Sequence, residues 1–324
     1  MQTLLYIAQF TVGLILILKG ADWLTDGASS IARRFNISSL VIGLTIVAFG
    51  TSAPELVVSV ISAVQGETEM AIGNVVGSNI FNSLAIMGLT AIVYPIFCSR
   101  NNIRYDVPFC LVASVALFAM ATDGAAITRG NGITLLCFFA IFLSYTFAIA
   151  HKASSKPEQE KQPAKAQQPE AGLSMTKAIL LFSIGLACLV FGGNWLVDGA
   201  SGIAALLGVS QSVIALTIVA AGTSFPELVT SIVAARKGDT DMAMGNVVGS
   251  NIFNIFLVLG VSSTISPLQL GSITAIDLGV LLGSAILLWL FCRFGKRKYY
   301  ITRFEGVVLT LCAIAYYTYA VLTA

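Results

Sequence analysis

The 324-residue sequence has little charge: Asp, Glu, Lys and Arg together make up 10%, and there is one histidine. A soluble globular domain has about 25% charged residues, so this composition excludes that class. Hydrophobic residues reach 56%, and several apolar runs exceed the ~20 residues that a helix needs to cross a bilayer. The sequence therefore predicts an all-α membrane protein in contact with lipid, and we expect no nucleic-acid partner.

Motifs for redox, metal or hydrolytic chemistry are also missing. No GxGD, HExxH or GxSxG occurs, so we expect neither an enzyme nor a cofactor. The first apolar run lacks a basic n-region and an A-x-A-like site, which indicates a retained helix rather than a cleaved signal peptide. The six cysteines show no CxxC spacing and are interpreted as small buried hydrophobes or single loop thiols: Cys98, Cys110, Cys137, Cys188, Cys292 and Cys312.

Apolar segments separated by polar breaks predict ten transmembrane helices. Their approximate limits are 4–26, 39–64, 70–94, 106–122, 131–150, 177–199, 212–235, 242–265, 273–292 and 305–323. Residues 151–173, rich in Lys, Gln, Pro and Ala, cannot bury apolar area and are predicted to form a disordered linker. The linker separates a first five-helix repeat, 1–150, from a second, 174–324.

The basic residues predict the orientation of these helices. With ten spans, alternate loops share one side of the membrane, and that side holds sixteen of the eighteen Lys and Arg. Basic loops stay in the cytoplasm. We therefore expect both termini outside, the linker 151–173 in the cytoplasm, and a multi-pass protein of the plasma (inner) membrane.

The second half of the chain repeats the first. GTSAPELVVS at 50–59 returns as GTSFPELVTS at 222–231, and GNVVGSNIFN at 73–82 recurs unchanged at 245–254, both with an offset of 172 residues. Five spans per half is an odd number, so the second copy must enter from the opposite face. Inverted repeats with broken helices are typical of secondary transporters, whose sites lie near the bilayer midplane. Duplication for packing alone is the alternative, but packing does not need an acid at bilayer depth.

The motif GTSAPE places a helix breaker just before an acid. Pro54 has no N–H, and its ring collides with the carbonyl of Gly50, so carbonyls from Ala48 to Thr51 are expected to lose their helical donors. In hydrocarbon such carbonyls need a polar neighbour or a bound cation. Thr51 and Ser52 add hydroxyls beside Glu55. The second copy supplies the corresponding set: Ala220, Thr223, Ser224 and Glu227.

The motif GNVVGSNIFN is predicted to form the opposing wall. Asn74, Ser78 and Asn82 recur every four residues on one helix face, and the second copy offers Asn246, Ser250 and Asn254. Interhelical hydrogen bonding is the alternative role for each residue taken singly. Together the two motifs predict four broken helices, the second, third, seventh and eighth, around one midplane site.

Every polar group in these motifs presents oxygen, and none is His or Cys. Carboxylates, hydroxyls and carbonyls suit hard cations, and Ca²⁺ takes about six to eight such ligands. One Ca²⁺ would neutralise two facing glutamates, and two or three Na⁺ could use the same oxygens in different subsets. Ca²⁺ and Na⁺ would then compete for the same oxygens, and this competition is the physical basis of exchange.

The paired motifs GTSAPE…GNVVGSNIFN resemble the α-repeats of the sodium/calcium exchanger family, within the cation/Ca²⁺ exchanger superfamily. The resemblance covers nearly the whole chain and implies a minimal exchanger that moves Ca²⁺ outward against Na⁺, with about three Na⁺ per Ca²⁺ and net charge movement. Ca²⁺ and Na⁺ are then substrates, and no obligatory protein partner is expected. The resemblance makes Glu55 and Glu227 the central ligands. The other implied ligands are Thr51, Thr223, Ser52, Ser224, Ser78, Ser250, Asn82, Asn254 and the carbonyls of Ala48 and Ala220.

One departure from the family pattern concerns Asn254. Some relatives, including those that co-transport K⁺, have Asp there, so Asn in both copies makes K⁺ coupling less favourable. The rival function is a Ca²⁺/H⁺ exchanger or an exchanger of another divalent cation, but GNVVGSN lacks the acid that the proton-coupled branch usually has. An intramembrane hydrolase would need two unequal groups, which a symmetric glutamate pair does not offer. A passive channel does not call for broken helices in inverted repeats.

Several charged residues outside the motifs are expected to have plain structural roles. Asp22 is expected to pair locally with Lys19, three residues before it. Asp26 and Asp198, each beside a tryptophan, are interpreted as interfacial anchors.

Overall fold

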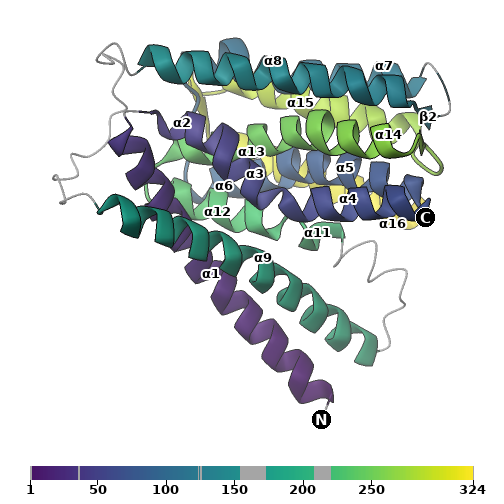
Figure 1. The fold of residues 1–324 in the computed structure, drawn as a ribbon, viewed down its shortest axis with the longest axis horizontal. Coiled ribbons are helices and arrows are strands. Elements are labelled where there is room, and N and C mark those ends of the chain that lie inside the picture. Colours follow the sequence, from purple (N-terminus) through teal and green to yellow (C-terminus); the bar gives the residue numbers. More distant parts are fainter. Residues whose placement is uncertain are drawn as a thin grey trace.

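The computed structural model describes residues 2–35, 37–122, 124, 126–153, 173–207 and 220–323, and within them the chain is a bundle of long helices (Figure 1). The helices of the first half are α1 (Gln2–Arg34), α2 (Ser39–Ile42), α3 (Ala48–Thr51), α4 (Ala53–Gln65), α5 (Thr68–Ile80), α6 (Met87–Val93), α7 (Val107–Thr122) and α8 (Arg129–Ala153). Those of the second half are α9 (Met175–Leu206), α11 (Ala220–Gly222), α12 (Phe225–Arg236), α13 (Thr240–Ile252), α14 (Gly260–Ile265), α15 (Ala275–Phe294) and α16 (Arg303–Thr323). Within the described residues, four π-helical segments continue these helices: η1 (Gly43–Val47), η2 (Phe81–Ile86), η3 (Asn102–Asp106) and η5 (Phe253–Leu259).

Nine of the ten predicted spans have a counterpart in the described part of the chain. Eight helices there are long and apolar enough to cross a membrane, and a ninth span is the bent pair Ser39–Thr51 and Ala53–Gln65. The predicted span 212–235 begins outside the described residues, and its described part contains α11 and α12. The predicted linker 151–173 lies mostly outside them as well.

The second and third predicted spans differ in how they depart from a regular helix. The second is bent by 47° between α3 and α4, with Pro54 in the first turn of α4, as the sequence predicts. The third runs from Thr68 to Val93 and the eighth from Thr240 to Ile265 as continuous helices. The prediction of a break in these two is wrong. Neither contains a proline, and the helix changes to π-helical geometry at η2 and η5 instead.

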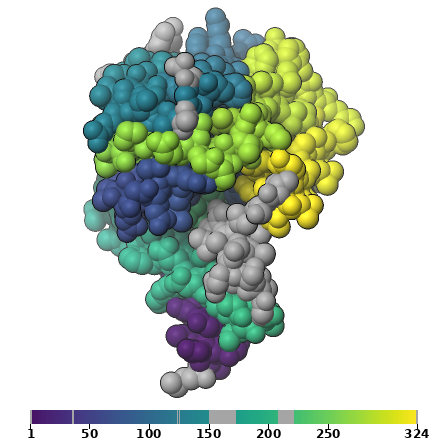
Figure 2. All heavy atoms as spheres, turned by 90° about the vertical axis from the view of Figure 1, so that its right-hand side faces the viewer, coloured from purple at the N-terminus to yellow at the C-terminus, as the bar shows by residue number. Residues whose placement is uncertain are grey.

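These two continuous helices form the centre of the molecule. In the most apolar stretch of Thr240–Ile265, 89% of the residues are buried, and in that of Thr68–Val93 78%, against 22–39% in the other single spanning helices. Around them lie α7, α8, α15 and α16, while α1 and α9 project from the body as a pair (Figure 1). Viewed from the side, the start of α1 lies below the rest of the molecule (Figure 2).

Glycines set the distance between α1 and α9. Gly13, Gly20 and Gly27 recur every seven residues, as do Gly185, Gly192 and Gly199. A Cβ added at Gly20 would lie 2.8 Å from the carbonyl oxygen of Gly185, and one added at Gly185 would lie 2.7 Å from that of Gly20. Because Gly13 meets Gly192 and Gly27 meets Ala178, the two helices run antiparallel. Such close backbone approach is what holds helices together where lipid removes the hydrophobic drive.

Two short strand pairs join loops at the two ends of the bundle. β1 (Ile96–Phe97) pairs antiparallel with β4 (Tyr300–Ile301), and β2 (Ala126–Ile127) pairs antiparallel with β3 (Leu268–Gln269). Each pair joins two loops that the alternation of spans places on the same side. We call the end with β1, β4 and the turn between α12 and α13 the basic face. The end with β2, β3 and the turn between α4 and α5 is the opposite face.

The β1–β4 pair also brings two cysteines together. The Sγ atoms of Cys98 and Cys292 lie 3.1 Å apart, and both residues are buried. The interpretation of all six cysteines as separate hydrophobes or single thiols therefore misses this contact. The two residues are 194 positions apart in sequence, so no local spacing could indicate it.

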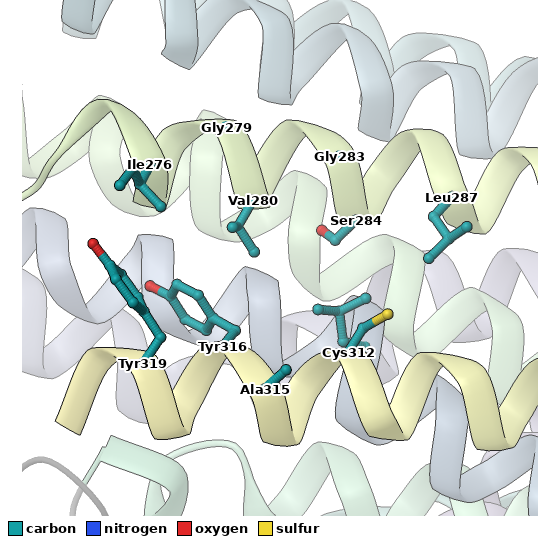
Figure 3. Close-up of a pocket in the computed structure, with 11 residues that line it drawn as sticks. Ile276, Gly279, Val280, Gly283, Ser284, Leu287, Cys312, Ala315, Tyr316 and Tyr319 are labelled. Atoms are coloured by element: carbon teal, nitrogen blue, oxygen red, sulfur yellow. The ribbon is translucent and has the colours of Figure 1, made fainter. Parts of the chain in front are cut away.

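An apolar groove of about 560 Å³ lies between α15 and α16 (Figure 3). Its walls include Val280 and Leu287 from α15 and Cys312 and Tyr316 from α16, and Leu84 of η2 also contributes. The hydroxyl of Tyr316 donates to the Asp277 carboxylate at 3.0 Å. The groove is distinct from the ion site described below, although η2 contributes to both.

The packing of α1 on α9 predicts opposite effects for two glycine-to-alanine changes. Gly20→Ala puts a methyl group against backbone atoms, so we expect a loss of about 1–3 kcal/mol of unfolding free energy. Gly279→Ala, where no atom of the described residues lies within 4 Å of the added Cβ, should be neutral or stabilising. Thermal unfolding of the two purified variants in the same detergent measures the difference. Equal stability would contradict the close-packing argument.

Candidate ion-binding site

Two fully buried glutamates occupy equivalent positions in the two repeats. Glu55 lies in the first turn of α4 and Glu227 in the first turn of α12, each directly after a proline, and both have 0% exposure. Proline is favoured at this position because the first-turn N–H groups have no helical acceptor. The partial positive charge of a helix N-terminus stabilises a carboxylate there.

Each glutamate is bound by a serine of the other repeat. The Ser224 hydroxyl donates to Glu55 Oε1 at 3.0 Å, and the Ser52 hydroxyl donates to Glu227 Oε1 at 2.9 Å. The arrangement is reciprocal, so both breaks, at Ser52 and at Ser224, face one centre. The two carboxylates lie within electrostatic reach of each other. The structure thus brings together the two acids that the sequence predicted as central ligands.

A threonine of each repeat also lies beside the glutamate of the other repeat. Thr51 lies beside the Glu227 carboxylate and Thr223 beside that of Glu55. The Thr51 hydroxyl also donates to Asn246 Oδ1 at 3.1 Å. Ser250 contributes a longer contact, 3.5 Å from its hydroxyl to Glu227 Oε1.

Asn74 and Asn246 position the glutamates through the backbone. The Asn74 side-chain amide donates to the Glu55 carbonyl at 3.3 Å and to Ser59 at 3.0 Å. The Asn246 amide donates to the Glu227 carbonyl at 3.2 Å and to Ser231 at 2.9 Å. These asparagines were not among the predicted ligands. Their place on the four-residue polar stripe is the sequence signal for their role.

The central helices are fixed where they cross by two further asparagines. The Asn79 amide donates to the Asn251 carbonyl at 3.1 Å, and the Asn251 amide donates to the Ser83 hydroxyl at 2.7 Å. Asn82 and Asn254 are neighbours of this crossing in the π-helical segments η2 and η5. Contacts between the repeats therefore join the two central helices beside these segments.

Within the part of the chain that the structure describes, a set of buried oxygens at this centre has no hydrogen-bond donor. Buried polar atoms are almost always satisfied, and an unsatisfied one is costly. The atoms come from both repeats: Glu55 Oε2, Glu227 Oε2, Ser78 Oγ, Asn82 Oδ1 and Asn254 Oδ1. Two carboxylate oxygens with neutral oxygens around them form the ligand set of a hard cation. Among the described residues no group of three or more His, Cys, Asp and Glu could hold a metal ion, so neutral oxygens must complete any cation shell.

The carbonyl of Ala48 differs from the expectation. The chain turns at Ser52, with φ −85° and ψ 7°, and the Ser52 N–H donates to the Ala48 carbonyl at 2.9 Å. The expected loss of its helical donor is therefore wrong. The Ser52 N–H is the ordinary helical donor four residues after Ala48, so this carbonyl stays in the helix, and the Thr51 hydroxyl also approaches it at 3.4 Å. For Ala220 the structure describes its place at the start of α11.

The two copies of GNVVGSNIFN differ in exposure. Gly245, Asn246 and Gly249 of α13 are buried, whereas Gly73, Asn74 and Gly77 of α5 are partly exposed. A Cβ added at Gly245 would lie 2.7 Å from the Leu40 carbonyl oxygen, so α13 packs tightly on α2. At the basic face, the glycines of this motif in α13 therefore pack directly on the backbone of α2 and η1.

Comparison with known proteins agrees with this geometry. Residues 5–148 and 177–322 match the family described as sodium/calcium exchanger protein. The inner membrane protein YrbG of Escherichia coli is 35% identical over 309 residues, covering 95% of this chain and 94% of YrbG. The sodium/calcium exchanger MaX1 of Methanosarcina acetivorans is 32% identical over 338 residues, covering 94% of this chain and 95% of MaX1.

A solved structure of the sodium-calcium exchanger NCX_Mj superposes on the fold with a TM-score of 0.82, at 32% identity and 99% coverage of both chains. The same exchanger has been solved after soaking with Na⁺ and Sr²⁺. Taken together, these matches show a multi-pass integral membrane protein that is a cation/Ca²⁺ antiporter and not an enzyme. The chain belongs to the sodium/calcium exchanger family.

Proposed function

We propose that this protein exchanges Na⁺ for Ca²⁺ across the membrane by alternating access. The observation that carries the proposal is the reciprocal contact of each buried glutamate with a serine of the other repeat, together with the donor-less oxygens around them. Two facing carboxylates need a positive charge between them. Ca²⁺ or a set of Na⁺ ions supplies it, and both loads need the same oxygens.

The proposed ligands combine the donor-less oxygens with the hydroxyls and carbonyls that the family resemblance implies. Glu55 and Glu227 bind both ions. The remaining ligands are the hydroxyls of Thr51, Thr223, Ser52, Ser224, Ser78 and Ser250, the side chains of Asn82 and Asn254, and the carbonyls of Ala48 and Ala220. A transport ratio of about three Na⁺ per Ca²⁺ would move net charge, so the membrane potential would contribute to the driving force.

The alternating-access part of the proposal rests on two inverted five-helix repeats, 1–150 and 174–324. The strand pairs at the two ends of the bundle support this topology, because each joins a loop of one repeat to a loop of the other. By the positive-inside rule the basic face is cytoplasmic, with both termini outside and the linker 151–173 inside. We take this structure as the state closed at the basic face, where Gly245 of α13 packs on the backbone of α2. In the other state the two repeats exchange these conformations.

The alternative function is exchange of Ca²⁺ for H⁺, or exchange of another divalent cation. Both buried glutamates could carry protons. However, the stripe that faces them offers Asn and Ser in both repeats and no further acid. Varying Na⁺, K⁺ and pH separately in liposomes that hold the purified protein distinguishes these functions.

Removing either carboxylate charge should abolish exchange. Glu55→Gln and Glu227→Gln each remove one of the two anionic ligands of the bound cation, so we expect ion affinity to fall by more than about 100-fold, or about 3 kcal/mol. The measurement is Na⁺-driven ⁴⁵Ca²⁺ uptake in inside-out vesicles. Glu67→Gln removes an exposed acid in the turn before α5 and is the matched control. Undiminished uptake in either buried-site variant would refute the assignment.

The pair of asparagines in the site predicts transport that does not depend on K⁺. Replacing K⁺ by choline at clamped membrane potential should leave the Na⁺-driven Ca²⁺ flux of the wild type unchanged. Asn254→Asp adds a third carboxylate, and we expect it to make the flux respond to K⁺. A wild-type flux that needs K⁺ would contradict this prediction.

A further inference from the structure

Lys237 links the turn after α12 to α1 at the basic face. Its Nζ lies 2.9 Å from Asp26 Oδ1 and 3.3 Å from Asp22 Oδ1. It also donates to the Asp22 carbonyl at 3.0 Å and to the Thr25 hydroxyl at 3.1 Å. Two residues further on, Asp239 accepts a hydrogen bond from Ser29 at 3.1 Å. We call this set, Asp22, Thr25, Asp26, Ser29, Lys237 and Asp239, the latch.

The latch corrects two expectations from the sequence. The partner that the structure gives Asp22 is Lys237, 215 residues away, and not its neighbour Lys19. Asp26 has the same partner, so it does more than anchor α1 at the interface. Both contacts join the first repeat to the second at the basic face, which the proposed function takes as the closed face of this state.

The 172-residue repeat defines the counterpart of each latch residue at the opposite face. Lys237 corresponds to Gln65, Asp22 to Asn194 and Thr25 to Val197. Three pairs keep the same kind of side chain in both repeats: Asp26 with Asp198, Ser29 with Ser201 and Asp239 with Glu67. The corresponding residues at the opposite face therefore lack the lysine ammonium group, one of the two carboxylates that bind it, and the threonine hydroxyl. Gln65, Asn194 and Asp198 are exposed in this structure.

We propose that the latch is an asymmetric lock that favours the state open to the opposite face, with Lys237 as its positioning residue. The inference rests on the proposed function, because alternating access requires the two repeats to exchange conformations. In that exchange the contacts of Lys237 at the basic face are replaced by contacts of Gln65 at the opposite face. A neutral amide facing one carboxylate replaces a cation facing two, so the second state is less stabilised.

How strongly the latch favours one state over the other follows from the exposure of the ion pair. The side chains of Lys237 and Asp26 are 34% and 53% exposed, so water screens much of their attraction. Exposed ion pairs of this kind shift an equilibrium by about twofold to fivefold. A bias of this size leaves both states populated, which a transporter needs in every cycle.

The test compares apparent Ca²⁺ affinities at the two faces in liposomes where the protein has one orientation. The apparent affinity at a face weakens as the state open to that face becomes less populated. Lys237→Gln should therefore weaken the apparent Ca²⁺ affinity at the opposite face and strengthen it at the basic face. The ratio of the two affinities should change by about twofold to fivefold. Gln65→Lys combined with Asn194→Asp installs a latch on the other side and should move the ratio in the same direction.

Two controls separate the latch from a general loss of charge or fold. Arg236→Gln removes the neighbouring exposed cation of the same helix end and should leave the ratio unchanged. Lys237→Arg should keep the wild-type ratio. Raising the ionic strength with choline chloride should move the wild-type ratio toward that of Lys237→Gln, because salt screens an exposed pair.

A second readout needs no ion flux. In a cysteine-free background, Gly77→Cys on the partly exposed face of α5 reports accessibility from the opposite face to an impermeant maleimide. Combining Lys237→Gln, Gln65→Lys and Asn194→Asp should slow this labelling at least about twofold. Slower labelling in a protein without Na⁺-driven Ca²⁺ uptake would uphold the latch and contradict only the proposed function. An unchanged affinity ratio with unchanged labelling would overturn the latch.

Discussion

The structure depends on two carboxylates that are buried in the same place and cannot both stay charged without a cation. Burying one charge is costly, and burying two of the same sign adds their repulsion. Serine hydroxyls and helix N-termini reduce this cost, but they supply no net charge. The cost of burial that remains makes the centre unfavourable without an ion, and a Ca²⁺ ion or a set of Na⁺ ions can compensate it. A carrier benefits from this, because it should cross between states only when loaded.

Duplication explains why the centre is built from so few sequence elements. One copy of GTS-x-PE places a glutamate after a proline and a serine before it, and that serine donates to the glutamate of the other copy. A second copy, entering the centre from the other side, provides the missing partner for each. Asn74 and Asn246 act within their own repeat, each holding the backbone of its glutamate. The site therefore combines hydrogen bonds from asparagine to the glutamate backbone within each repeat with hydrogen bonds from serine to the glutamate side chain between the repeats.

The sequence predicted nine of the spans and the meeting of the two buried acids because both follow from local patterns. Apolar runs define the spans, and the acid that follows a proline marks the site. Contacts between distant residues were not predictable in this way. The seven-residue glycine pattern does not reveal that Gly20 meets Gly185, and nothing near Cys98 indicates Cys292. The π-helical geometry at Asn82 and Asn254 was missed for the same reason, since Asn79, Ser83 and Asn251 link the two central helices there.

The two repeats are alike where they face the ion and unlike where they reach the two faces of the bundle. GNVVGSNIFN is identical in both copies, so under the proposed exchange the ion would meet similar ligands in either state. At the helix ends, Lys237 stands where the other copy has Gln65, and Asp22 where it has Asn194. A symmetric centre with asymmetric ends separates two requirements: the centre sets which ions compete, and the ends set how often each face is open. The preference between faces can then change by substitutions that leave every ion ligand in place.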